Sequence, residues 1–503
     1  MERREADICL ILEGTYPYVM GGVSNWTHEL IRSQPHLTFA LLCILPPDGK
    51  TNLKFELPEN VIAVENVFLQ KLPRGDSPFF EKEVSALFKR IEIPLVRLQY
   101  EPSLKDLKEI IEGLRETKFK LGSNILLHSQ EAWQMIVRMY STTMGDSSFL
   151  NFFWSWIGLL GSFFSVMLGT IPPAKVYHAL CTGYAGLFLA RAHLEKGKPC
   201  LLTEHGIYTN ERRIEIMAAS WLDDMRAMDL SVDRPVYVRD LKDFWVETFK
   251  GYSRLTYEVC DTIITLYEEN RNLQLMDGAD ELKTQIVPNG IDVTEYEKIE
   301  RSETHPPTVA LIGRIVPIKD VKNFLYAVSL LKEHIPQVRA LVLGGWDEDP
   351  DYYRECENFV HALELDDTVQ FTGRVNVKEY LGSIDVIALT SISEVMPLVV
   401  LEGGAAGIPC VCTNVGACSE LIYGRFDEEP KIGPGGAICP LSSPTEIANQ
   451  VLSLLLNKEE RLTRGQNLKR RIMRYYNKPD VDKFYAELYN NLIEKGSLQP
   501  WQA

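Results

Sequence analysis

Short apolar runs recur along the chain, and amphipathic stretches separate them. Runs of four to eight apolar residues between turn residues are typical of buried strands, whereas apolar positions three and four apart are typical of helices. Their alternation predicts parallel sheets with helices on both faces, the doubly wound α/β class. The predicted strands are 7–13, 39–45, 61–64, 175–180, 199–203, 262–266, 284–287, 308–312, 341–343, 369–372, 385–389, 410–413 and 437–439.

Two domains follow from breaks in this alternation. Residues 296–307 are polar and form the best linker candidate in the chain. We therefore predict an N-terminal domain over 1–298, with a helix-rich insertion at about 70–170, and a second domain over 299–477. Amphipathic helices are expected at 443–457, 459–475 and 480–495, and Pro479 predicts a change of direction at Lys478.

Residues 149–171 carry no charged side chain over 23 positions. By length this stretch qualifies as a membrane span. Flanking Lys and Arg residues show no asymmetry, and a single crossing would split the first sheet across the bilayer. The favoured interpretation is a buried or groove-lining helix pair, broken near Gly158–Gly161. Contact with a membrane protein partner stays open as an alternative.

The stretch 391–407 contains the strongest candidate site. The apolar run 385–389 predicts a strand, a turn through Ser393 and Met396 follows, and Pro397 and Leu398 open a helix to about residue 406. A helix N-terminus after a strand is an anion site. Two carboxylates, Glu394 in the turn and Glu402 in the helix, bracket it. The alternative is a surface carboxylate and a helix-face carboxylate with no common ligand.

The chain's formal net charge of −16 argues against nucleic acid as a partner. A phosphate ligand would therefore need a local basic cluster. Arg314 and Lys319 follow the predicted strand 308–312 and suit this purpose, since an Arg fork fits phosphate oxygens and Lys adds a point charge. A solvated charge pair is the alternative.

Two further candidates lie in the first half of the chain. Gly21 and Gly22 stand where a helix follows the first strand, and glycine there permits close approach of a ligand, although a plain tight turn is the alternative. His205 follows the predicted strand 199–203 directly. That position is the carboxyl edge of a parallel sheet, where α/β proteins bind ligands. A structural histidine is the competing interpretation.

The ten cysteines show no Cys-x-x-Cys spacing, and several lie in apolar runs, which suggests a reducing compartment. The N-terminus is too polar at its start for a signal peptide. We therefore expect a cytoplasmic protein.

These motifs resemble retaining family-4 glycosyltransferases of the GT-B fold. The similarity lies in Glu394 and Glu402 eight residues apart, the Arg-x4-Lys of Arg314 and Lys319, the glycine loop, and Pro-Asn-Gly-Ile-Asp at 288–292. The resemblance implies two Rossmann-like domains facing across a cleft. It places Glu402 on the donor ribose, Glu394 by the donor sugar, and the basic pair on the diphosphate without metal. It also implies that 478–503 crosses back to the N-terminal domain. Gly403 and Gly404 depart from the bulkier residues of relatives, which leaves the helix length open.

A narrower resemblance concerns PelF-type enzymes, which make the Pel exopolysaccharide. It rests on GTYPYVMGGVSNW, HALCTGYAG, and Glu-His-Gly-x-Tyr followed by Glu-Arg-Arg-x-Glu. It implies transfer from a UDP-sugar onto a growing polysaccharide, with no cofactor, and partners in an inner-membrane synthase complex that hold the protein at the membrane. One alternative is a catalytically silent nucleotide-sugar-binding scaffold. Another is a GT-B epimerase or phosphorylase, although no sequence sign of a pyridoxal phosphate lysine is present.

Overall fold

The computed structural model describes residues 4–77, 81–143, 148–219, 240–302 and 304–495. It forms two compact units. The first comprises Met1–Thr265, Asn270–Gln285 and Tyr485–Ala503, and the second comprises Leu266–Glu269 and Ile286–Phe484. Residues 286–298, which the sequence assigned to the N-terminal domain, therefore group with the second unit. The reason is a backbone tie: Ile291 N donates to Tyr476 O at 2.9 Å, and Lys478 N donates to Ile291 O at 2.9 Å.

Each unit contains a parallel sheet. The first has the order β3-β2-β1-β4-β5-β6-β7 and the second β10-β9-β8-β11-β12-β13, so both change winding direction beside their first strand. The strands are β1 Ala6–Glu13, β2 Phe39–Leu45, β3 Val61–Phe68, β4 Ala174–Ala179, β5 Cys200–Glu204, β6 Thr262–Thr265, β7 Thr284–Ile286, β8 Thr308–Ile312, β9 Arg339–Leu343, β10 Val369–Gly373, β11 Val386–Leu389, β12 Cys410–Thr413 and β13 Gly436–Cys439. Every strand predicted from the apolar runs is present.

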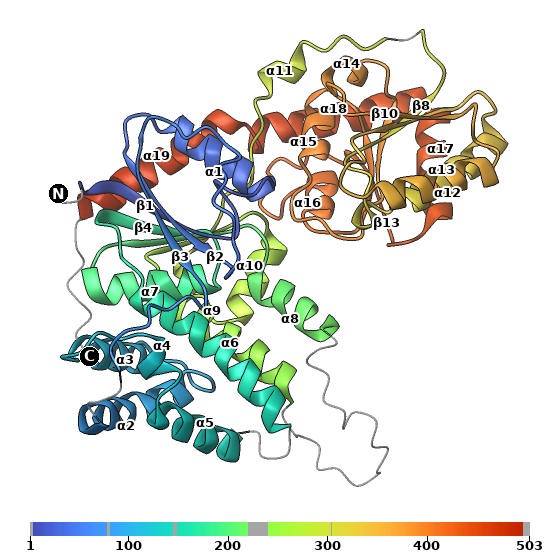
Figure 1. Ribbon diagram of the computed structural model, residues 1–503. Helices are drawn as coiled ribbons and strands as arrows, with labels where there is room; N and C mark the ends of the chain where they lie inside the picture. The colour runs from blue at the N-terminus through green and yellow to red at the C-terminus, as the bar shows by residue number, and fades with distance from the viewer. Residues whose placement is uncertain (1–3, 78–80, 144–147, 220–239, 303, 496–503) are drawn as a thin grey trace. The chain divides into compact units, whose positions relative to one another are not determined.

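Helices connect these strands (Figure 1). They are α1 Gly22–Ser33, α2 Glu81–Arg97, α3 Leu104–Arg115, α4 Ser123–Leu126, α5 Gln130–Thr143, α6 Phe149–Leu168, α7 Tyr184–Lys196, α8 Tyr208–Ala218, α9 Leu241–Val259, α10 Glu268–Met276, α11 Thr294–Glu297, α12 Val321–His334, α13 Pro350–Ala362, α14 Lys378–Leu381, α15 Leu398–Ala405, α16 Cys418–Tyr423, α17 Pro444–Leu456, α18 Lys458–Tyr475 and α19 Lys478–Lys495. The helices α2 to α6 all fall between β3 and β4, which is where the sequence predicted an insertion.

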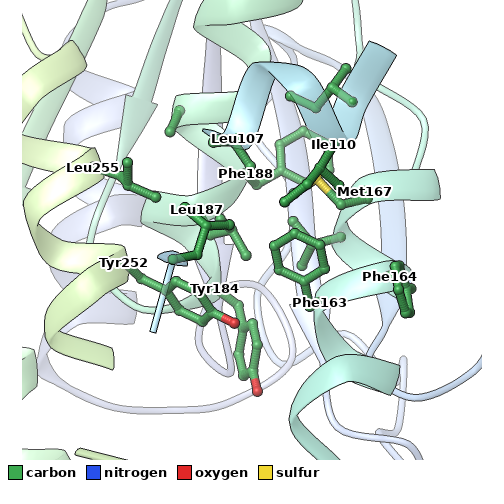
Figure 2. Close-up of a cluster of buried hydrophobic side chains, with 14 of the residues drawn as sticks. Leu107, Ile110, Phe163, Phe164, Met167, Tyr184, Leu187, Phe188, Tyr252 and Leu255 are labelled. Atoms are coloured by element: carbon green, nitrogen blue, oxygen red, sulfur yellow. The ribbon is translucent and has the colours of Figure 1, made fainter. Parts of the chain in front are cut away.

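A layer of helices packs on one face of the first sheet and extends its core into the inserted helices. Figure 2 shows Leu107 and Ile110 of α3, Phe163 of α6, Phe188 of α7 and Leu255 of α9 gathered in one buried cluster. Side chains of this size each contribute roughly 1.5–3 kcal/mol when buried. The inserted helices are therefore part of the first unit's core.

Helix α6 is the one helix among the described residues that is long and apolar enough to cross a membrane. It is a single helix, so the prediction of a helix pair broken near Gly158–Gly161 is wrong. Those glycines lie inside the helix, where a β-carbon at 158 would lie 3.6 Å from the Trp245 ring and one at 161 would lie 3.6 Å from Gln70. A β-carbon at either position would make only ordinary van der Waals contact, so neither glycine ends the helix and neither is required by packing. Most of the helix's apolar window is buried, at 61%.

The second sheet is covered on both faces. One core contains residues of α12, α13 and α17, and the other contains residues of α15, α16 and α18. The chain then turns at Tyr476 and Asn477 and enters α19. The sequence predicted a change of direction at Lys478; the break between α18 and α19 falls just before it, at Tyr476 and Asn477, and Lys478 is the first residue of α19. Proline is accommodated because it lies in the first helical turn, where its missing N–H is not needed.

The C-terminal half of α19 belongs to the first unit. Tyr489 Oη lies 2.7 Å from His178 Nδ1, and His178 Nε2 lies 2.9 Å from Thr203 Oγ1. Thr203 Oγ1 also lies 3.1 Å from Tyr485 Oη. These side chains are all buried, so the chain of hydrogen bonds satisfies polar groups that the helix would otherwise bury at a cost.

One ion pair is fully enclosed in the second unit. Arg471 on α18 donates two hydrogen bonds to Glu428, at 2.7 and 3.0 Å, and neither side chain is exposed. Arg471 also donates to the carbonyls of Leu421, Ile422 and Gly433. Burial alone would raise the pKa of Glu428, but the bonds from Arg471 outweigh it and leave that pKa below its ordinary value.

Replacing Glu428 by Gln should destabilise the protein by about 3–5 kcal/mol, because it leaves the Arg471 charge buried and unpaired. Glu429→Gln makes the same chemical change one residue away on an exposed side chain and serves as the control. Urea unfolding of both variants measures the difference. Because a depressed carboxylate pKa stabilises the fold above the unfolded value, that stability should fall on acidification below about pH 4.5 in the wild type and not in Glu428→Gln. Equal unfolding midpoints for the two variants would contradict the assignment.

Candidate functional site

Loops that follow β8 and β11 meet in the second unit. In this sheet β8 lies between β9 and β11, so the winding direction changes between β8 and β11. Parallel α/β sheets bind ligands outside the carboxyl ends of their strands at such a point. Two bonds join the loops: Ile392 N donates to Ile318 O at 2.8 Å, and Thr390 Oγ1 donates to Lys319 O at 2.8 Å.

Two predicted site residues meet here. Lys319 Nζ forms an ion pair with Glu394 Oε1. Ser391 Oγ donates to the same carboxylate oxygen at 2.7 Å. The side chains of Lys319 and Glu394 are 19% and 14% exposed, so the pair is mostly shielded but still reaches solvent. The arrangement presents a fixed ammonium group at the edge of the sheet.

Glycines hold these loops in place. Gly416, at φ +49°, lies so close to the loop that a β-carbon would come 2.3 Å from the carbonyl oxygens of Glu394 and Val395. Ala417 N donates to Val395 O at 2.8 Å. A β-carbon at Gly344 would come 1.9 Å from the carbonyl oxygen of Gly313. The loops that carry Glu394 and Arg314 therefore pack directly against neighbouring backbone, which limits their movement.

Helix α15 begins immediately after the Glu394 loop. Pro397 is its N-cap residue and no side chain caps it, so the first N–H groups of the helix are available to an anion. Met396 and Pro397 are buried, whereas Ser393 and Leu398 are exposed. The sequence left the helix length open because of Gly403 and Gly404. The helix extends through both. Packing requires glycine at each position, since a β-carbon at Gly403 would come 2.3 Å from Ile387 and one at Gly404 2.7 Å from Leu468.

Glu402 has a different partner from Glu394. Its carboxylate accepts a hydrogen bond from Tyr296 of α11, a residue that the sequence did not single out. Burial raises the pKa of Glu402, although the Tyr296 bond and the charge of Lys378 oppose the shift. The two carboxylates that bracket the turn therefore have separate partners in the described part of the chain.

Arg314 lies apart from the Lys319 pair. Its side chain is 61% exposed and pairs with Glu348, which is itself 56% exposed. An exposed pair of this kind contributes little to stability. Arg314 is therefore free to exchange Glu348 for another anion at small cost.

The candidates of the first unit occupy two other positions. Gly21 is the N-cap of α1, and a β-carbon at Gly21 or Gly22 would meet no atom within 4 Å, so packing inside the protein does not demand glycine there. His205 follows β5 and is 7% exposed. Its carbonyl accepts a bond from Asn270 at 2.8 Å, while neither ring nitrogen has a hydrogen-bond partner among the described residues.

The ring of Trp26 packs against the imidazole of His205, whose nitrogens have no hydrogen-bond partner among the described residues. The two rings lie edge to face with centroids 4.6 Å apart, and Trp26 lies 5.5 Å from Tyr485 in the same geometry. Trp26 ends the motif GTYPYVMGGVSNW, but the sequence predicted no role for it. Its contacts join α1, β5 and α19, which are far apart in sequence. Burial lowers the pKa of His205 to about 4, so the imidazole is neutral at physiological pH.

Two family models match the chain, one in each half. Residues 6–282 match the family "Domain of unknown function (DUF3492)", which is more than half of the chain. The chain belongs to the DUF3492 family. In this DUF3492 protein, residues 292–471 match "Glycosyl transferases group 1", so the second unit is a group 1 glycosyltransferase domain. The first match lies in the first compact unit except for Leu266–Glu269, and the second match lies within the second unit.

Curated relatives cover the DUF3492 protein only in part. N-acetyl-alpha-D-glucosaminyl L-malate synthase of Bacillus anthracis is 29% identical over 203 residues, which are 40% of this chain and 50% of the relative. UDP-Gal:alpha-D-GlcNAc-diphosphoundecaprenol alpha-1,3-galactosyltransferase of Escherichia coli is 26% identical, over 36% of this chain and 49% of the relative. MMP alpha-(1->4)-mannosyltransferase of Mycolicibacterium hassiacum is 25% identical, over 64% and 71% respectively. The chain thus spans about half the length of the first two.

Solved structures confirm the fold class. Anabaena Alr3699/HepE in complex with UDP matches with a TM-score of 0.57 at 14% identity, over 96% of this chain and all of that one. Sucrose-phosphate synthase from Thermosynechococcus elongatus matches with a TM-score of 0.56 at 15% identity, over 97% of this chain and all of that one. The DUF3492 protein has the GT-B fold, with two Rossmann-like domains.

Trp26→Ala should raise the pKa of His205 from about 4 toward the ordinary value of 6.5, because water then reaches the imidazole and relieves the burial that disfavours its charged form. NMR titration of histidine-labelled protein measures this, with His205→Gln assigning the signal. Trp26→Phe keeps an aromatic edge and should leave the pKa near its wild-type value. Trp154→Ala, at a tryptophan 62% exposed, is the control. An unchanged pKa in Trp26→Ala would show that Trp26 does not shield the ring.

Proposed function

We propose that this protein is a retaining glycosyltransferase that moves a sugar from a UDP-sugar onto a growing exopolysaccharide of the Pel type. The observation that carries the proposal is the Lys319–Glu394 pair at the switch point of a group 1 glycosyltransferase domain, beside the uncapped N-terminus of α15. An ammonium group and a helix N-terminus together suit a diphosphate. The names of two similar proteins, which contain UDP, support testing UDP-sugars first.

Each donor-site residue has a proposed role. The backbone N–H groups that follow Pro397, beginning with that of Leu398, and the charge of Lys319 bind the diphosphate, with Arg314 joining after it leaves Glu348. Ser393 and Met396 line the turn that leads into this helix. Glu402 accepts hydrogen bonds from the ribose hydroxyls, and the buried Tyr296 fixes its carboxylate. Glu394, held by Lys319 and Ser391, accepts from hydroxyls of the donor sugar.

The proposed mechanism relies on positioning and charge. Departure of the diphosphate develops negative charge on its oxygens; Lys319, already held by Glu394, stabilises that charge, and Arg314 adds to it once it has exchanged Glu348 for the diphosphate. Retention of configuration follows from front-face attack assisted by the leaving phosphate, so no protein nucleophile is required. His205 is proposed as a catalytic residue of the first unit, where its neutral ring can donate one hydrogen bond and accept another. Gly21 and Gly22 leave backbone N–H groups open to substrate.

No metal or other cofactor is part of the proposal. Protein cations supply the charge that a metal supplies in other transferases. The acceptor is a polysaccharide, and the protein is placed in the cytoplasm, at the inner membrane through partners of a synthase complex. A catalytically silent nucleotide-sugar scaffold is the second candidate, since the same residues would bind a donor without turning it over.

Glu402→Gln should weaken UDP binding by about 1.5–3 kcal/mol, because a ribose hydroxyl loses a charged acceptor. It should not reduce the thermal midpoint at pH 7, since the raised pKa of Glu402 means that its buried charge lowers stability there.

Glu394→Gln should retain UDP affinity and lose turnover. Calorimetry with UDP and a sugar-release assay measure both, and Glu379→Gln, an exposed carboxylate nearby, is the control. Wild-type UDP affinity in Glu402→Gln would refute the ribose role.

Lys319→Gln and Arg314→Gln should each weaken donor binding, and the loss should shrink as salt rises because screening reduces charge attraction. Lys322→Gln is the matched control, because Lys322 of α12 is paired with Glu355 of α13.

Transferase activity should be unchanged when EDTA removes divalent metal ions. Activity that EDTA abolishes and Mg²⁺ or Mn²⁺ restores would overturn the metal-free mechanism. Tight binding of a UDP-sugar with neither transfer nor hydrolysis, over a panel of acceptors, would favour the scaffold.

A further inference from the structure

The turn that carries His205 is closed by the side chain of the residue before it. Glu204 ends β5, His205 follows, and Tyr208 is the first residue of α8. Glu204 Oε1 accepts a hydrogen bond from Tyr208 N at 3.1 Å, so the carboxylate spans the turn from one end to the other. The N-cap residue Ile207 provides no side-chain bond to the helix. Glu204 therefore satisfies an N–H group at the start of α8 and complements the positive end of its dipole.

The Glu204 carboxylate is completely buried and fully bonded. Its Oε1 also accepts from Thr182 Oγ1 at 3.1 Å, and its Oε2 accepts from Tyr257 Oη and Gln274 Nε2, each at 2.9 Å. With the bond from Tyr208, each oxygen has two donors, which fills its lone-pair positions. Burial raises the pKa of Glu204, although the four hydrogen bonds oppose that shift.

Helix α10 holds the turn with two amide side chains. Asn270 and Gln274 lie one helical turn apart, and both belong to the first unit. Gln274 donates to the Glu204 carboxylate, while Asn270 Nδ2 donates to the carbonyl oxygen of His205 at 2.8 Å. Asn270 is 3% exposed and Gln274 is fully buried. The backbone of His205 is therefore fixed on both sides by buried hydrogen bonds.

The imidazole of His205 has no such bonds. Neither ring nitrogen has a hydrogen-bond partner in the described part of the chain, although the residue is only 7% exposed. Most buried polar atoms in folded proteins are hydrogen bonded, and an exception calls for an explanation such as a catalytic role. The turn thus fixes the backbone of His205 and leaves both ring nitrogens to another molecule.

The four donors require a carboxylate at position 204. All of them are uncharged groups, and a buried carboxylate lowers stability unless hydrogen bonds compensate for the loss of water. A glutamine would place its NH2 group against the N–H of Tyr208 or of Gln274, and neither N–H can accept a hydrogen bond. Position 204 therefore needs an acceptor on both sides, which a carboxylate provides and an amide does not.

We infer that Glu204 is a positioning residue for His205, and that Asn270 assists it from α10. The inference rests on the proposed transferase function, in which His205 is catalytic. A catalytic group is effective only when it is held in the geometry that the reaction requires, and a misplacement of about 1 Å can lower a rate about 100-fold. The inference also gives a role to the Glu-His-Gly-x-Tyr stretch, because its first and last residues, Glu204 and Tyr208, bind each other.

The test uses the full chain and the variants Glu204→Gln, His205→Gln and their double variant. Asn270→Leu removes the bond to the His205 carbonyl with little change in side-chain shape, and it decides the question if Glu204→Gln does not fold. Glu428→Gln is the matched control, because Glu428 is also a fully buried carboxylate but belongs to the second unit, where it binds Arg471. Circular dichroism establishes which variants are folded at the assay temperature.

NMR of histidine-labelled protein measures the position of the ring without any substrate. The His205 signal is assigned by its loss in His205→Gln. It should shift in Glu204→Gln and in Asn270→Leu, and it should keep its wild-type position in Glu428→Gln. A His205 signal that is unchanged in the folded turn variants would overturn the inference.

Steady-state kinetics with a UDP-sugar give the second readout. Glu204→Gln should lower kcat about 10- to 100-fold and leave UDP affinity unchanged, because the turn contributes no group to the proposed nucleotide site. In the double variant, Glu204→Gln should cause no loss beyond that of His205→Gln, as expected if Glu204 acts only through the histidine. Losses that multiply in the double variant would contradict the positioning role.

Failure of the proposed function is seen separately, as a wild type that neither binds UDP nor consumes any UDP-sugar. The NMR measurement does not depend on turnover, so it still decides whether Glu204 and Asn270 position the ring of His205.

Discussion

The ion pair between Lys319 and Glu394 joins two loops at the switch point of the second sheet, and the candidate donor site depends on it. Each charge neutralises the other, so both can remain in a position that is largely shielded from water. The hydroxyl of Ser391 and the bond between Thr390 and Lys319 restrict the same loops. A diphosphate that approaches α15 would therefore meet a lysine that is already oriented, and the carboxylate would gain sugar hydroxyls as partners.

The switch points of the two sheets have the same topology but differ in the charge of the groups around them. In the second, a lysine and a helix N-terminus create a site for negative charge. In the first, Glu13 caps the N-terminus of α7 through Ala185 and so cancels the positive end of that helix. A switch point with its helix end neutralised offers less attraction to phosphate. One carboxylate thus distinguishes the two positions electrostatically.

Much of this architecture could be predicted from the sequence. The apolar runs identified each strand, since parallel strands buried on both faces are continuous in hydrophobicity. The motif around Glu394 also gave the position of α15. The glycines at 158 and 161 were misjudged because glycine in a sequence does not reveal whether it breaks a helix or admits a neighbour. Pro479 correctly indicated a break before the last helix, but not that Lys478 begins that helix, since the effect of proline depends on which helical turn it occupies.

The partners of the site residues could not be predicted. Tyr296 binds Glu402 across more than a hundred positions of sequence, and Trp26 reaches His205 from another helix. Arg212 and Trp245 line one cavity from α8 and α9. Contacts of this kind depend on how helices pack, which residue spacing does not encode. Sequence motifs therefore identified residues with chemistry, whereas the structure identified the residues that orient them.

A crystal structure of the chain with UDP bound is the measurement that tests the central claim most directly. The account predicts the diphosphate at the N-terminus of α15, within hydrogen-bond distance of Lys319, and the ribose hydroxyls on the carboxylate of Glu402. A ribose bound to another carboxylate, or UDP seated at the cavity beside Glu13 and Arg212, would contradict it.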